Sequence, residues 1–512
     1  MDELTCFKTY DIRGEVDVNL TPDIARRIGR AYAVWLHPLR VVVGADVRLS
    51  SEALKTALID GLTAGGVDVI DLGMTGTEEV YFATRELRAD GGIQVTASHN
   101  PAKFNGYKVY GADGCQITIE AADRIYSFIS AEQTLQPALP SFQKYLDNGM
   151  ISYIDDETIE SYYQMINGLR IAPTDERLHI VYSPLNGTGN VPVREMLKRM
   201  GNIDVDVVAE QEMPDGHFPT CPYPNPEIRQ AMQKGLELCE KVKPDLLLGT
   251  DPDCDRCGTA VPDHKGGYRL ISGNEMGVIL LDYICKSRIA NGHMPERPVA
   301  VTTIVSTDMV DAVAERYGVE LRRVLTGFKF IGEQIGNLEA AGEEARYIFG
   351  FEESYGYLSG THVRDKDAVN ASLLIMEAAA YYAQKGMNLG DAIDSLYEEY
   401  GYYRNDLCSF TFEGVSGMQT MKNLMERLRA EEPEELAGRK VLSSVDYEND
   451  DTGLPKAQVL EYRLEGKAKL IVRPSGTEPK IKVYLSAVGK TREEADSVIE
   501  TMKQTANELM KA

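Results

Sequence analysis

The sequence predicts an α/β protein with four domains around a central cleft: three related units with mixed or parallel sheets, then a smaller C-terminal α+β domain. Short apolar runs alternate with stretches of helical apolar spacing, which is the pattern of parallel sheets. This alternation occurs three times, and the C-terminal segment departs from it. At about 150 residues per domain, 512 residues also favour three or four domains.

The first unit, residues 1–155, opens the alternation of strands and helices. LRVVVGAD (39–46) is an expected strand, and SSEALKTALIDGLTAGG (50–66) follows as an expected helix with a serine cap. GVDVIDLG (66–73) and GGIQVTAS (91–98) are two further expected strands. This order predicts a mainly parallel sheet.

The same theme returns in residues 156–266 and 267–400. The strands expected there are RLHIVYSP (177–184), IDVDVVAE (203–210), KPDLLLGTD (243–251), RPVAVTTI (297–304), VELRRVLTG (319–327) and ARYIFGFEES (345–354). In each of the three units one strand leads into a polar loop, namely TASHNP, GTDPDCDR or GFEESYG. Open α/β sheets bind ligands beyond the carboxyl ends of their strands, so these loops are expected to meet in one cleft.

The last unit, residues 401–512, has a different pattern. KLIVRPSGTEPKIKVYLSAV (469–488) predicts a strand, a glycine-bearing loop and a second strand. The final segment, TREEADSVIETMKQTANELMKA, has the spacing of an amphipathic helix. Together they predict a small α+β domain.

Composition restricts the partners. Lys and Arg number 54 against 79 Asp and Glu, and a formal charge of −25 disfavours nucleic acid. No apolar run approaches the ~18 residues of a membrane span, and the N-terminus lacks a secretory signal. Eight cysteines without framework spacing favour reduced thiols, hence a cytoplasmic protein. Cys254 and Cys257 form a C-x-x-C without the second pair of a zinc ribbon, which leaves a redox role as the alternative.

The loop in LLLGTDPDCDR (246–256) gives the most specific chemical signal. Asp251, Asp253 and Asp255 alternate at the end of an expected strand, where alternation points their carboxylates the same way. Crowded carboxylates repel one another unless a cation lies between them, and oxygen ligands suit Mg²⁺. The spacing lacks the Gly and Glu that an EF-hand requires, and a solvated acidic turn is the alternative.

TASHNP (96–101) sets Ser98 beside His99, just before a turn-forming Asn-Pro pair. Taken alone, this serine fits a capping turn. A phosphate on Ser98 would add about −1.5 to −2 charge and supply a further oxygen to a magnesium ion. The aspartates need a cation, and a phosphate on Ser98 would give that cation a further oxygen ligand. We therefore favour a phosphorylated serine that joins the metal ligands.

RPSGTEPK (473–480) predicts a cradle for a second phosphate. Its donors are the Arg473 guanidinium, the Ser475 and Thr477 hydroxyls and the backbone N–H groups around Gly476. An ordinary turn is the alternative.

GFEESYGYLSGTHVRDK (350–366) follows another expected strand. Glu352 and Ser354 could bond vicinal sugar hydroxyls, and Lys366 lies further along the loop. An exposed acidic turn is the alternative for this segment.

Together these motifs resemble the α-D-phosphohexomutase superfamily, which holds phosphoglucomutases, phosphomannomutases and phosphoglucosamine mutases. The motifs that carry the resemblance are YDIRG (10–14), TASHNP, NGYK (105–108), DPDCDR, TGFKFIG (326–332), FEES and RPSGTEPK. They span nearly the whole chain in the order of the superfamily. The resemblance implies four domains that carry, in turn, the phosphoserine, metal-binding, sugar-binding and phosphate-binding loops.

The resemblance also implies a role for each matched residue. The phosphoserine Ser98 would bind magnesium together with Asp251, Asp253 and Asp255. The groups around the reacting phosphoryl group would be Arg13, His99, Lys108 and Arg256. Contacts to the sugar and its distal phosphate would come from Thr326, Glu352, Ser354 and Lys366. The non-reacting phosphate would be held by Arg473, Ser475, Gly476 and Thr477.

The implied reaction is an isomerisation. Phospho-Ser98 gives its phosphoryl group to a hexose phosphate, the resulting glucose or mannose 1,6-bisphosphate turns end for end, and Ser98 takes back the other phosphoryl group. Magnesium and the basic residues would neutralise the charge of the transferring group. Lys108, expected near the cation Arg13, could have a lowered pKa and act as general base, with His99 as the competitor.

Two parts of the chain resemble enzymes that act on different substrates. FKTYDIRGEV with GMTGTEEVYFAT (73–84) looks most like bacterial phosphomannomutases, whereas TGFKFIG and GFEESYGYL look more like phosphoglucomutases. Glucose and mannose phosphates differ only at C2, so we predict activity on one or both. The alternatives are a strict phosphomannomutase, a phosphoglucosamine mutase, a metal-assisted serine phosphatase and a non-catalytic phosphosugar sensor. The oligomeric state stays open.

Overall fold

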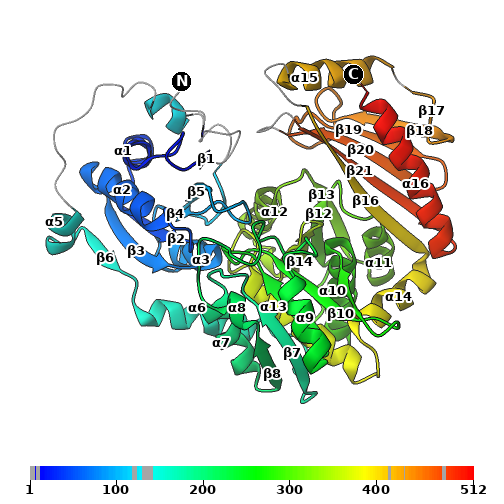
Figure 1. Ribbon diagram of the computed structural model, residues 1–512, viewed down its shortest axis with the longest axis horizontal. Coiled ribbons are helices and arrows are strands. Elements are labelled where there is room, and N and C mark those ends of the chain that lie inside the picture. The colour runs from blue at the N-terminus through cyan, green and yellow to red at the C-terminus, as the bar shows by residue number, and fades with distance from the viewer. Residues whose placement is uncertain are drawn as a thin grey trace. The chain divides into compact units, whose positions relative to one another are not determined.

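The computed structural model describes residues 6, 12–117, 124–129, 142–412, 417–431, 433–475 and 480–511 (Figure 1). The chain divides into two compact units, which are described separately. Unit 1 takes its described residues from Met1–Val301 and Phe328–Gly390, and unit 2 takes them from Thr302–Gly327 and Asp391–Ala512.

The first sheet of unit 1 has the strand order β1-β5-β4-β2-β3-β6. Its strands are β1 (Ile12–Glu15), β2 (Arg40–Ala45), β3 (Asp68–Met74), β4 (Gly91–Val95), β5 (Phe104–Gly111) and β6 (Ile151–Tyr153). β2 is parallel to β3 and β4, whereas β5 is antiparallel to β1 and β4. The predicted strands at 39–46, 66–73 and 91–98 are therefore confirmed, in a sheet that is mixed.

Helices cover this sheet. They are α1 (Pro22–Leu36), α2 (Ser51–Ala64) and α3 (Thr77–Glu86), followed by α5 (Phe142–Asp147). α1 and α2 pack closely because each has a glycine at their contact. A Cβ on Gly29 would lie 2.2 Å from the Leu58 carbonyl oxygen, and one on Gly61 would lie 2.0 Å from that of Arg26.

The expected serine cap of α2 is wrong. Ser50 has helical backbone angles and its side chain makes no capping hydrogen bond. Its hydroxyl instead accepts a hydrogen bond from Asn105 Nδ2 on β5, at 2.9 Å. The tertiary contact has displaced the local one.

The second sheet of unit 1 has the order β11-β10-β9-β7-β8. Its strands are β7 (Leu178–Ser183), β8 (Ile203–Val207), β9 (Leu246–Thr250), β10 (Cys257–Pro262) and β11 (Tyr268–Ile271). The accompanying helices are α6 (Asp156–Gly168), α7 (Asn190–Met200), α8 (Ala209–Glu212) and α9 (Gln233–Val242). β7 is parallel to β8 and β9, and β9, β10 and β11 run antiparallel in turn. The loop between β9 and β10 carries the aspartate motif.

The remainder of unit 1 contains a hairpin among helices. Its elements are α10 (Gly273–Ala290), α12 (Phe328–Ala340), η1 (Glu344–Arg346), β14 (Tyr347–Glu352), β15 (Gly356–Leu358) and α13 (Ala368–Ala383). Glu352 pairs with Gly356 at the end of the hairpin, so the turn between β14 and β15 carries FEES. β12 (Val299–Thr303) crosses from unit 1 into unit 2.

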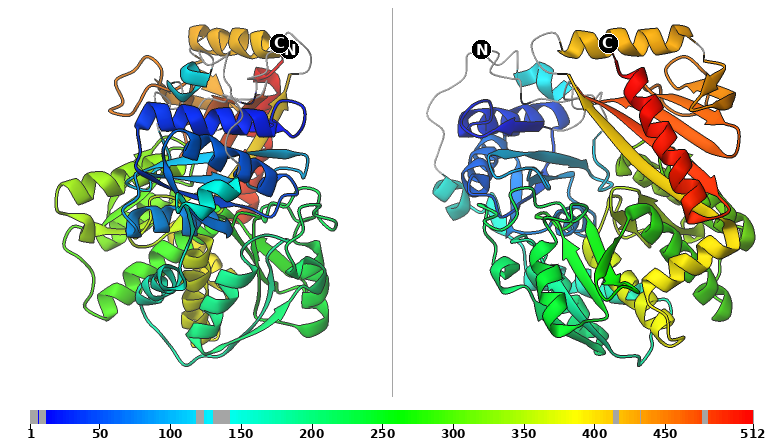
Figure 2. Two further views of the ribbon diagram at one scale, coloured as in Figure 1. Left: turned by 90° about the vertical axis from the view of Figure 1, so that its left-hand side faces the viewer. Right: turned by 45° about the vertical axis from the view of Figure 1, so that its right-hand side comes forward.

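Unit 2 contains an antiparallel sheet of order β16-β21-β20-β19-β18-β17. The strands are β16 (Tyr402–Thr411), β17 (Glu435–Leu436), β18 (Arg439–Asp446), β19 (Leu460–Leu464), β20 (Ala468–Pro474) and β21 (Lys480–Gly489). α15 (Gly417–Glu431) and α16 (Arg492–Leu509) pack on this sheet through one core, and Figure 2 shows α16 crossing it. The unit also holds α11 (Met309–Tyr317), β13 (Glu320–Val324) and most of α14 (Leu389–Tyr400).

The predicted fold class is confirmed: mixed α/β sheets precede a smaller C-terminal α+β unit. Within the described ranges, no helix combines the length and the apolar character that crossing a membrane requires.

The close contact of α1 and α2 makes a testable prediction. Gly61→Ala should lower the free energy of unfolding by about 1–3 kcal/mol, because the new methyl group overpacks against a backbone carbonyl. Gly336→Ala in α12 is the matched control: its Cβ meets nothing within 4 Å, so it should stabilise by about 0.5–1 kcal/mol. Thermal unfolding of both variants checks this, and a stabilising Gly61→Ala would contradict it.

Candidate active site

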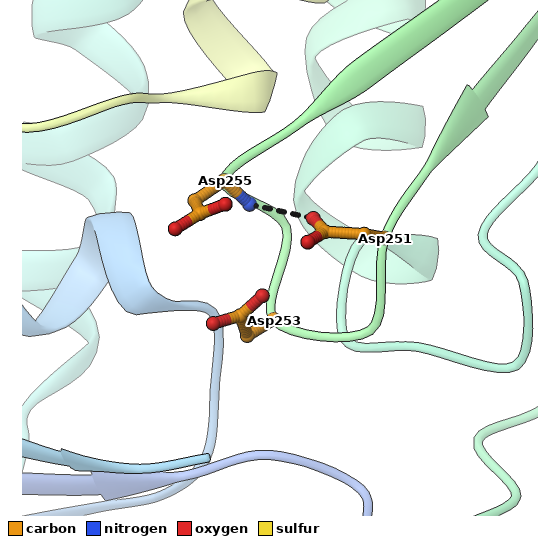
Figure 3. A group of neighbouring side chains, drawn as sticks. All are labelled: Asp251, Asp253 and Asp255. Carbon is orange, nitrogen blue, oxygen red and sulfur yellow. Dashed lines mark hydrogen bonds between the residues drawn. The ribbon is translucent and has the colours of Figure 1, made fainter. Parts of the chain in front are cut away.

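Three aspartate side chains from the loop between β9 and β10 converge on one another (Figure 3). One oxygen each from Asp251, Asp253 and Asp255 lies within 4.8 Å of the others, and none of the three residues is more than 2% exposed. Asp251 Oδ1 accepts hydrogen bonds from the backbone N–H groups of Asp255 at 3.0 Å and Arg256 at 2.9 Å. These bonds fold the loop back on itself.

The expected reason for this convergence is wrong, although the convergence itself is present. β9 ends at Thr250, so the three aspartates lie in a turn and not on an alternating strand. Within that turn Cys254 has a positive φ of 58°. The left-handed residue reverses the chain, and the reversal brings the carboxylates together.

The buried carboxylates lack enough hydrogen-bond donors. Burial first, and then the charges of Asp253 and Asp255, raise the pKa of Asp251 well above its usual range. Among the described residues, neither Asp253 Oδ1 nor Asp255 Oδ1 has a hydrogen-bond partner. Leaving buried carboxylate oxygens without partners is costly. The residues therefore fit a divalent cation, for which carboxylate oxygens are the preferred ligands.

Ser98 directs its hydroxyl at this cluster. Ser98 Oγ donates to Asp251 Oδ2 at 3.1 Å and lies 3.2 Å from His99 Nδ1. The residue is 4% exposed and has a positive φ of 51°, a conformation that costs about 1–2 kcal/mol outside glycine. The loop after β4 thus holds the serine in a strained conformation that faces the carboxylates.

Two lysines lie against the same carboxylates. Lys108 Nζ donates to Asp253 Oδ2 at 2.7 Å and to Asp255 Oδ2 at 2.5 Å. Lys366 Nζ lies 3.3 Å from Asp255 Oδ2 and 2.9 Å from Asp365 Oδ1. Burial alone would raise the pKa of Asp255, but Lys108, Lys366 and then Arg256 outweigh it and lower that pKa.

The expected lowered pKa of Lys108 is wrong for this arrangement. Burial would lower it, but the carboxylates of Asp253 and Asp255 outweigh burial and raise the pKa well above its usual range. The sequence argument considered only a neighbouring cation, whereas the nearest charges are negative. For His99, burial and then the charges of Arg256 and Arg13 hold the pKa well below its usual range, which keeps the imidazole neutral.

Two arginines connect the loops. Arg256 Nη1 donates to the Ser354 carbonyl at 2.7 Å and to Glu227 Oε1 at 3.0 Å, which joins the aspartate loop to the turn after β14. Arg13 Nη1 donates to Asn100 Oδ1 at 3.2 Å, beside the serine loop.

Glu352, the last residue of β14, is 4% exposed, and Lys366 is 8% exposed. Unit 1 contains eleven of the predicted site residues, namely Arg13, Ser98, His99, Lys108, Asp251, Asp253, Asp255, Arg256, Glu352, Ser354 and Lys366.

The remaining predicted residues belong to unit 2. Thr326 follows β13, and its buried hydroxyl has no hydrogen-bond partner in the described part of the chain. Arg473 Nη1 donates to the Tyr484 hydroxyl at 3.5 Å, and the Ser475 backbone N–H donates to the Lys480 carbonyl at 2.7 Å. The predicted Gly476 and Thr477, and the first two residues of YDIRG, lie outside the described residues.

Sequence reasoning missed the groups that support the aspartate loop. Thr77 Oγ1 donates to Asp253 Oδ2 at 3.0 Å, and Thr96 Oγ1 lies 3.2 Å from the same oxygen. Thr96 belongs to the TASHNP motif and could have been singled out there. Nothing in the local sequence marks Thr77, because its role depends on where α3 begins relative to the aspartate loop.

The C-x-x-C pair does not provide a reactive thiol. Both cysteines are buried, and burial raises the pKa of Cys257 to about 12 and that of Cys254 well above its usual range. A thiol must ionise to act as a nucleophile or a redox group, so these two residues are packing residues.

A serine hydroxyl that faces three buried carboxylates within this α/β fold is the arrangement expected of a phosphohexomutase. The chain matches the family described as "Phosphoglucomutase/phosphomannomutase" in all four of its parts: α/β/α domain I at residues 5–136, domain II at 160–266, domain III at 272–400 and the C-terminal domain at 424–504. The chain belongs to the phosphoglucomutase/phosphomannomutase family and is an isomerase that transfers phosphoryl groups.

One curated relative supports this family, and two solved structures share the fold. The phosphoglucomutase of Staphylococcus epidermidis is 34% identical over 503 residues, which cover 94% of this chain and 90% of the relative. A phosphoglucomutase/phosphomannomutase family protein from Burkholderia thailandensis has a crystal structure with a TM-score of 0.76 at 22% identity, over 99% of this chain and 98% of the other. Aspergillus fumigatus N-acetylphosphoglucosamine mutase, solved with GlcNAc-6P and magnesium, has a TM-score of 0.56 at 13% identity, over 99% and 96% of the two chains.

The carboxylate cluster predicts a response to divalent cations. Mg²⁺ at 100 times its dissociation constant should stabilise the protein by about 2.7 kcal/mol, because it binds only the folded cluster. Thermal unfolding with Mg²⁺ and with EDTA measures this shift. Asp253→Asn should remove most of it, whereas the exposed Asp68→Asn should keep it. Equal shifts in both variants would place the cation elsewhere.

Proposed function

We propose that the protein is a magnesium-dependent phosphohexomutase that interconverts the 1- and 6-phosphates of glucose, of mannose or of both, through phospho-Ser98 and a hexose 1,6-bisphosphate. The observation that carries this proposal is the 3.1 Å contact between Ser98 Oγ and Asp251 Oδ2. A free hydroxyl gains little from a strained position against three buried carboxylates. A phosphorylated serine in the same position would share a cation with the carboxylates, and the cation would offset the cost of the strained backbone.

The chain supplies ligands and positive charge for the transfer. Asp251, Asp253 and Asp255 would hold the ion, which when bound supplies charge neutralisation at the phosphoryl group. The bond between phosphorus and Ser98 Oγ breaks, and a bond from phosphorus to the sugar hydroxyl oxygen forms. Arg256, and Lys108 once it has taken up the proton, stabilise the negative charge of the transferring group. Both side chains lie within reach of the aspartates. The reverse transfer returns the other phosphoryl group to Ser98.

The proton of the sugar hydroxyl needs an acceptor. We assign Lys108 to this role, with His99 as the alternative. Lys108 can accept the proton only after its pKa has fallen, which requires that Asp253 and Asp255 be neutralised by a cation. His99 is already neutral, but its Nδ1 lies 3.2 Å from Ser98 Oγ and is engaged there.

The substrate contacts follow the same proposal. Glu352, Ser354, Lys366 and Thr326 would contact the sugar and its distal phosphate, and Arg473, Ser475, Gly476 and Thr477 would hold the non-reacting phosphate. The fungal structure with GlcNAc-6P and magnesium supports a phosphosugar and a metal as ligands of this fold. Glucose or mannose 1,6-bisphosphate would act as the activator.

We also propose the domain division 1–155, 156–266, 267–400 and 401–512, and a cytoplasmic location. The location is supported by the cysteines: all eight are described, and all are free thiols.

One prediction of this proposal concerns the phosphoacceptor. Ser98→Ala should abolish mutase turnover in a coupled assay with glucose 1-phosphate and glucose 1,6-bisphosphate, because the phosphoryl group loses its carrier. Peptide mapping of the native protein should find phosphate on Ser98. Ser372→Ala is the matched control: its hydroxyl donates to the Ala368 carbonyl within α13 and lies 3.6 Å from Cys257 Sγ, and neither partner is a predicted site residue, so activity should persist. Full activity of Ser98→Ala, or steady release of inorganic phosphate as from a phosphatase, would contradict the proposal.

Another prediction of this proposal concerns the sugar. Glu352→Gln should lower kcat/KM by roughly 10- to 100-fold for both glucose and mannose phosphates, because a charge-assisted hydrogen bond to a sugar hydroxyl is worth about 1.5–3 kcal/mol. The neighbouring Glu353→Gln should change it by less than threefold. Measurement with both sugar phosphates also gives the substrate preference. Equal effects of the two variants would remove Glu352 from the sugar site.

A further inference from the structure

Arg48 is a buried arginine in unit 1 with all five of its N–H donors engaged. Its side chain is fully buried, and a guanidinium has five donors in a fixed fork. The acceptors are Asp46 Oδ2 for Nε at 3.0 Å, the carbonyls of Pro101 and Phe104 for Nη1 at 2.8 and 2.9 Å, and the carbonyls of Ser98 and Asn100 for Nη2, both at 2.6 Å. Four of the five acceptors belong to the serine loop and the start of β5.

These bonds fix the peptide groups on both sides of the phosphoacceptor. The Ser98 N–H donates to Thr96 Oγ1 at 2.8 Å, while the Ser98 carbonyl accepts from Arg48. A non-glycine residue with a φ of 51° stays in the left-handed region only where its surroundings hold it there. Arg48 and Thr96 are the side chains that do so, and that backbone conformation sets the direction of the Ser98 hydroxyl.

Asp46 connects Arg48 to the aspartate loop. Its carboxylate accepts from Arg48 Nε, from the Arg48 N–H at 3.0 Å, from Ser51 Oγ at 2.6 Å and from Thr96 Oγ1 at 2.8 Å. Thr96 Oγ1 also lies 3.2 Å from Asp253 Oδ2. A continuous set of buried polar contacts therefore runs from the serine loop to the carboxylate cluster.

A segment from the second sheet region encloses the guanidinium. The Phe218 ring centre lies 5.3 Å from Arg48 Cζ, and Phe218 is 1% exposed. Two residues earlier, a Cβ on Gly216 would lie 2.6 Å from the Leu49 backbone nitrogen and 2.8 Å from Arg48 Cα. Only glycine permits this approach, which excludes water from the Arg48 hydrogen bonds.

We propose that Arg48 is a positioning residue for phosphoryl transfer: its saturated guanidinium holds the Ser98 loop in the strained conformation that aims Oγ at the carboxylate cluster. This inference rests on the proposed role of Ser98 as phosphoacceptor. Among the described residues, the hydrogen bonds of the Arg48 side chain go to Asp46, the serine loop and the start of β5, and none goes to a predicted sugar-binding residue. Loss of Arg48 should therefore act on the transfer step and leave binding of the hexose phosphate intact.

The test replaces Arg48 with lysine, which keeps the charge but has three donors and no planar fork. Arg48→Lys should lower kcat by roughly 100-fold, the effect of a small misplacement of a reacting group, while KM for glucose 1-phosphate changes less than threefold. The rate at which glucose 1,6-bisphosphate phosphorylates Ser98, followed by intact mass, should fall by the same factor as kcat. Phe218→Leu, which removes only the ring over the guanidinium, should give a smaller fall in kcat with KM again unchanged.

A matched control separates positioning from general destabilisation. Arg346 is 9% exposed and holds the Arg297 carbonyl and Glu343 at the start of β14. Arg346→Lys should lower the unfolding temperature to a similar extent as Arg48→Lys and leave kcat unchanged.

The outcomes are distinguishable from failure of the proposed function. The inference is overturned if Arg48→Lys keeps kcat within threefold of the native value, if KM rises in parallel with the fall in kcat, or if Arg346→Lys loses as much turnover. If Ser98→Ala remains active, the phosphoserine mechanism itself fails, and the positioning role fails with it. The combination of an inactive Ser98→Ala and a fully active Arg48→Lys would refute the inference alone.

Discussion

Mutual repulsion among three buried carboxylates is the constraint to which the rest of unit 1 responds. Asp251, Asp253 and Asp255 have oxygens within 4.8 Å of one another and are at most 2% exposed. Like charges at that spacing, away from water, cannot all stay ionised without compensation. The compensation in the structure comes from Lys108 and Lys366, whose ammonium groups contact the cluster, and from two threonine hydroxyls.

The three polar loops of unit 1 share a second constraint, which is backbone strain. Ser98, Cys254 and Tyr355 lie in these loops with positive φ values of 51°, 58° and 67°. In each case the strained residue's carbonyl accepts a hydrogen bond from another segment: from Arg48 for Ser98, from the Ala368 N–H for Cys254 and from the Cys257 N–H for Tyr355. Strain of this kind persists only where the surroundings hold it. Contacts from other segments therefore hold all three loops, and the bond from the Cys257 N–H to the Tyr355 carbonyl joins the end of the aspartate loop to the turn after β14.

The sequence predicted the elements whose signal is local. Apolar runs gave β2, β7, β9 and β14, and the order of motifs gave the family, because each depends on adjacent residues. The antiparallel strand β5 was not predicted, since its pairing with β1 and β4 is set by tertiary contacts. The aspartates were found, but the turn at Cys254 replaces the expected strand. The raised pKa of Lys108 and the proposed role of Arg48 could not be predicted from the sequence, because both depend on residues that only the fold brings close.

Charge also explains how so acidic a chain can receive a phosphosugar. The cations around the cluster are shared with further acids, since Arg256 also contacts Glu227 and Lys366 also contacts Asp365. The side chains near Ser98 therefore do not by themselves form a positive site. A divalent cation would reverse this balance locally and free Lys108 from the carboxylates, which would let lysine and arginine face an anionic phosphoryl group. On this reasoning the cation and the phosphate depend on each other, because each removes the electrostatic cost of bringing in the other.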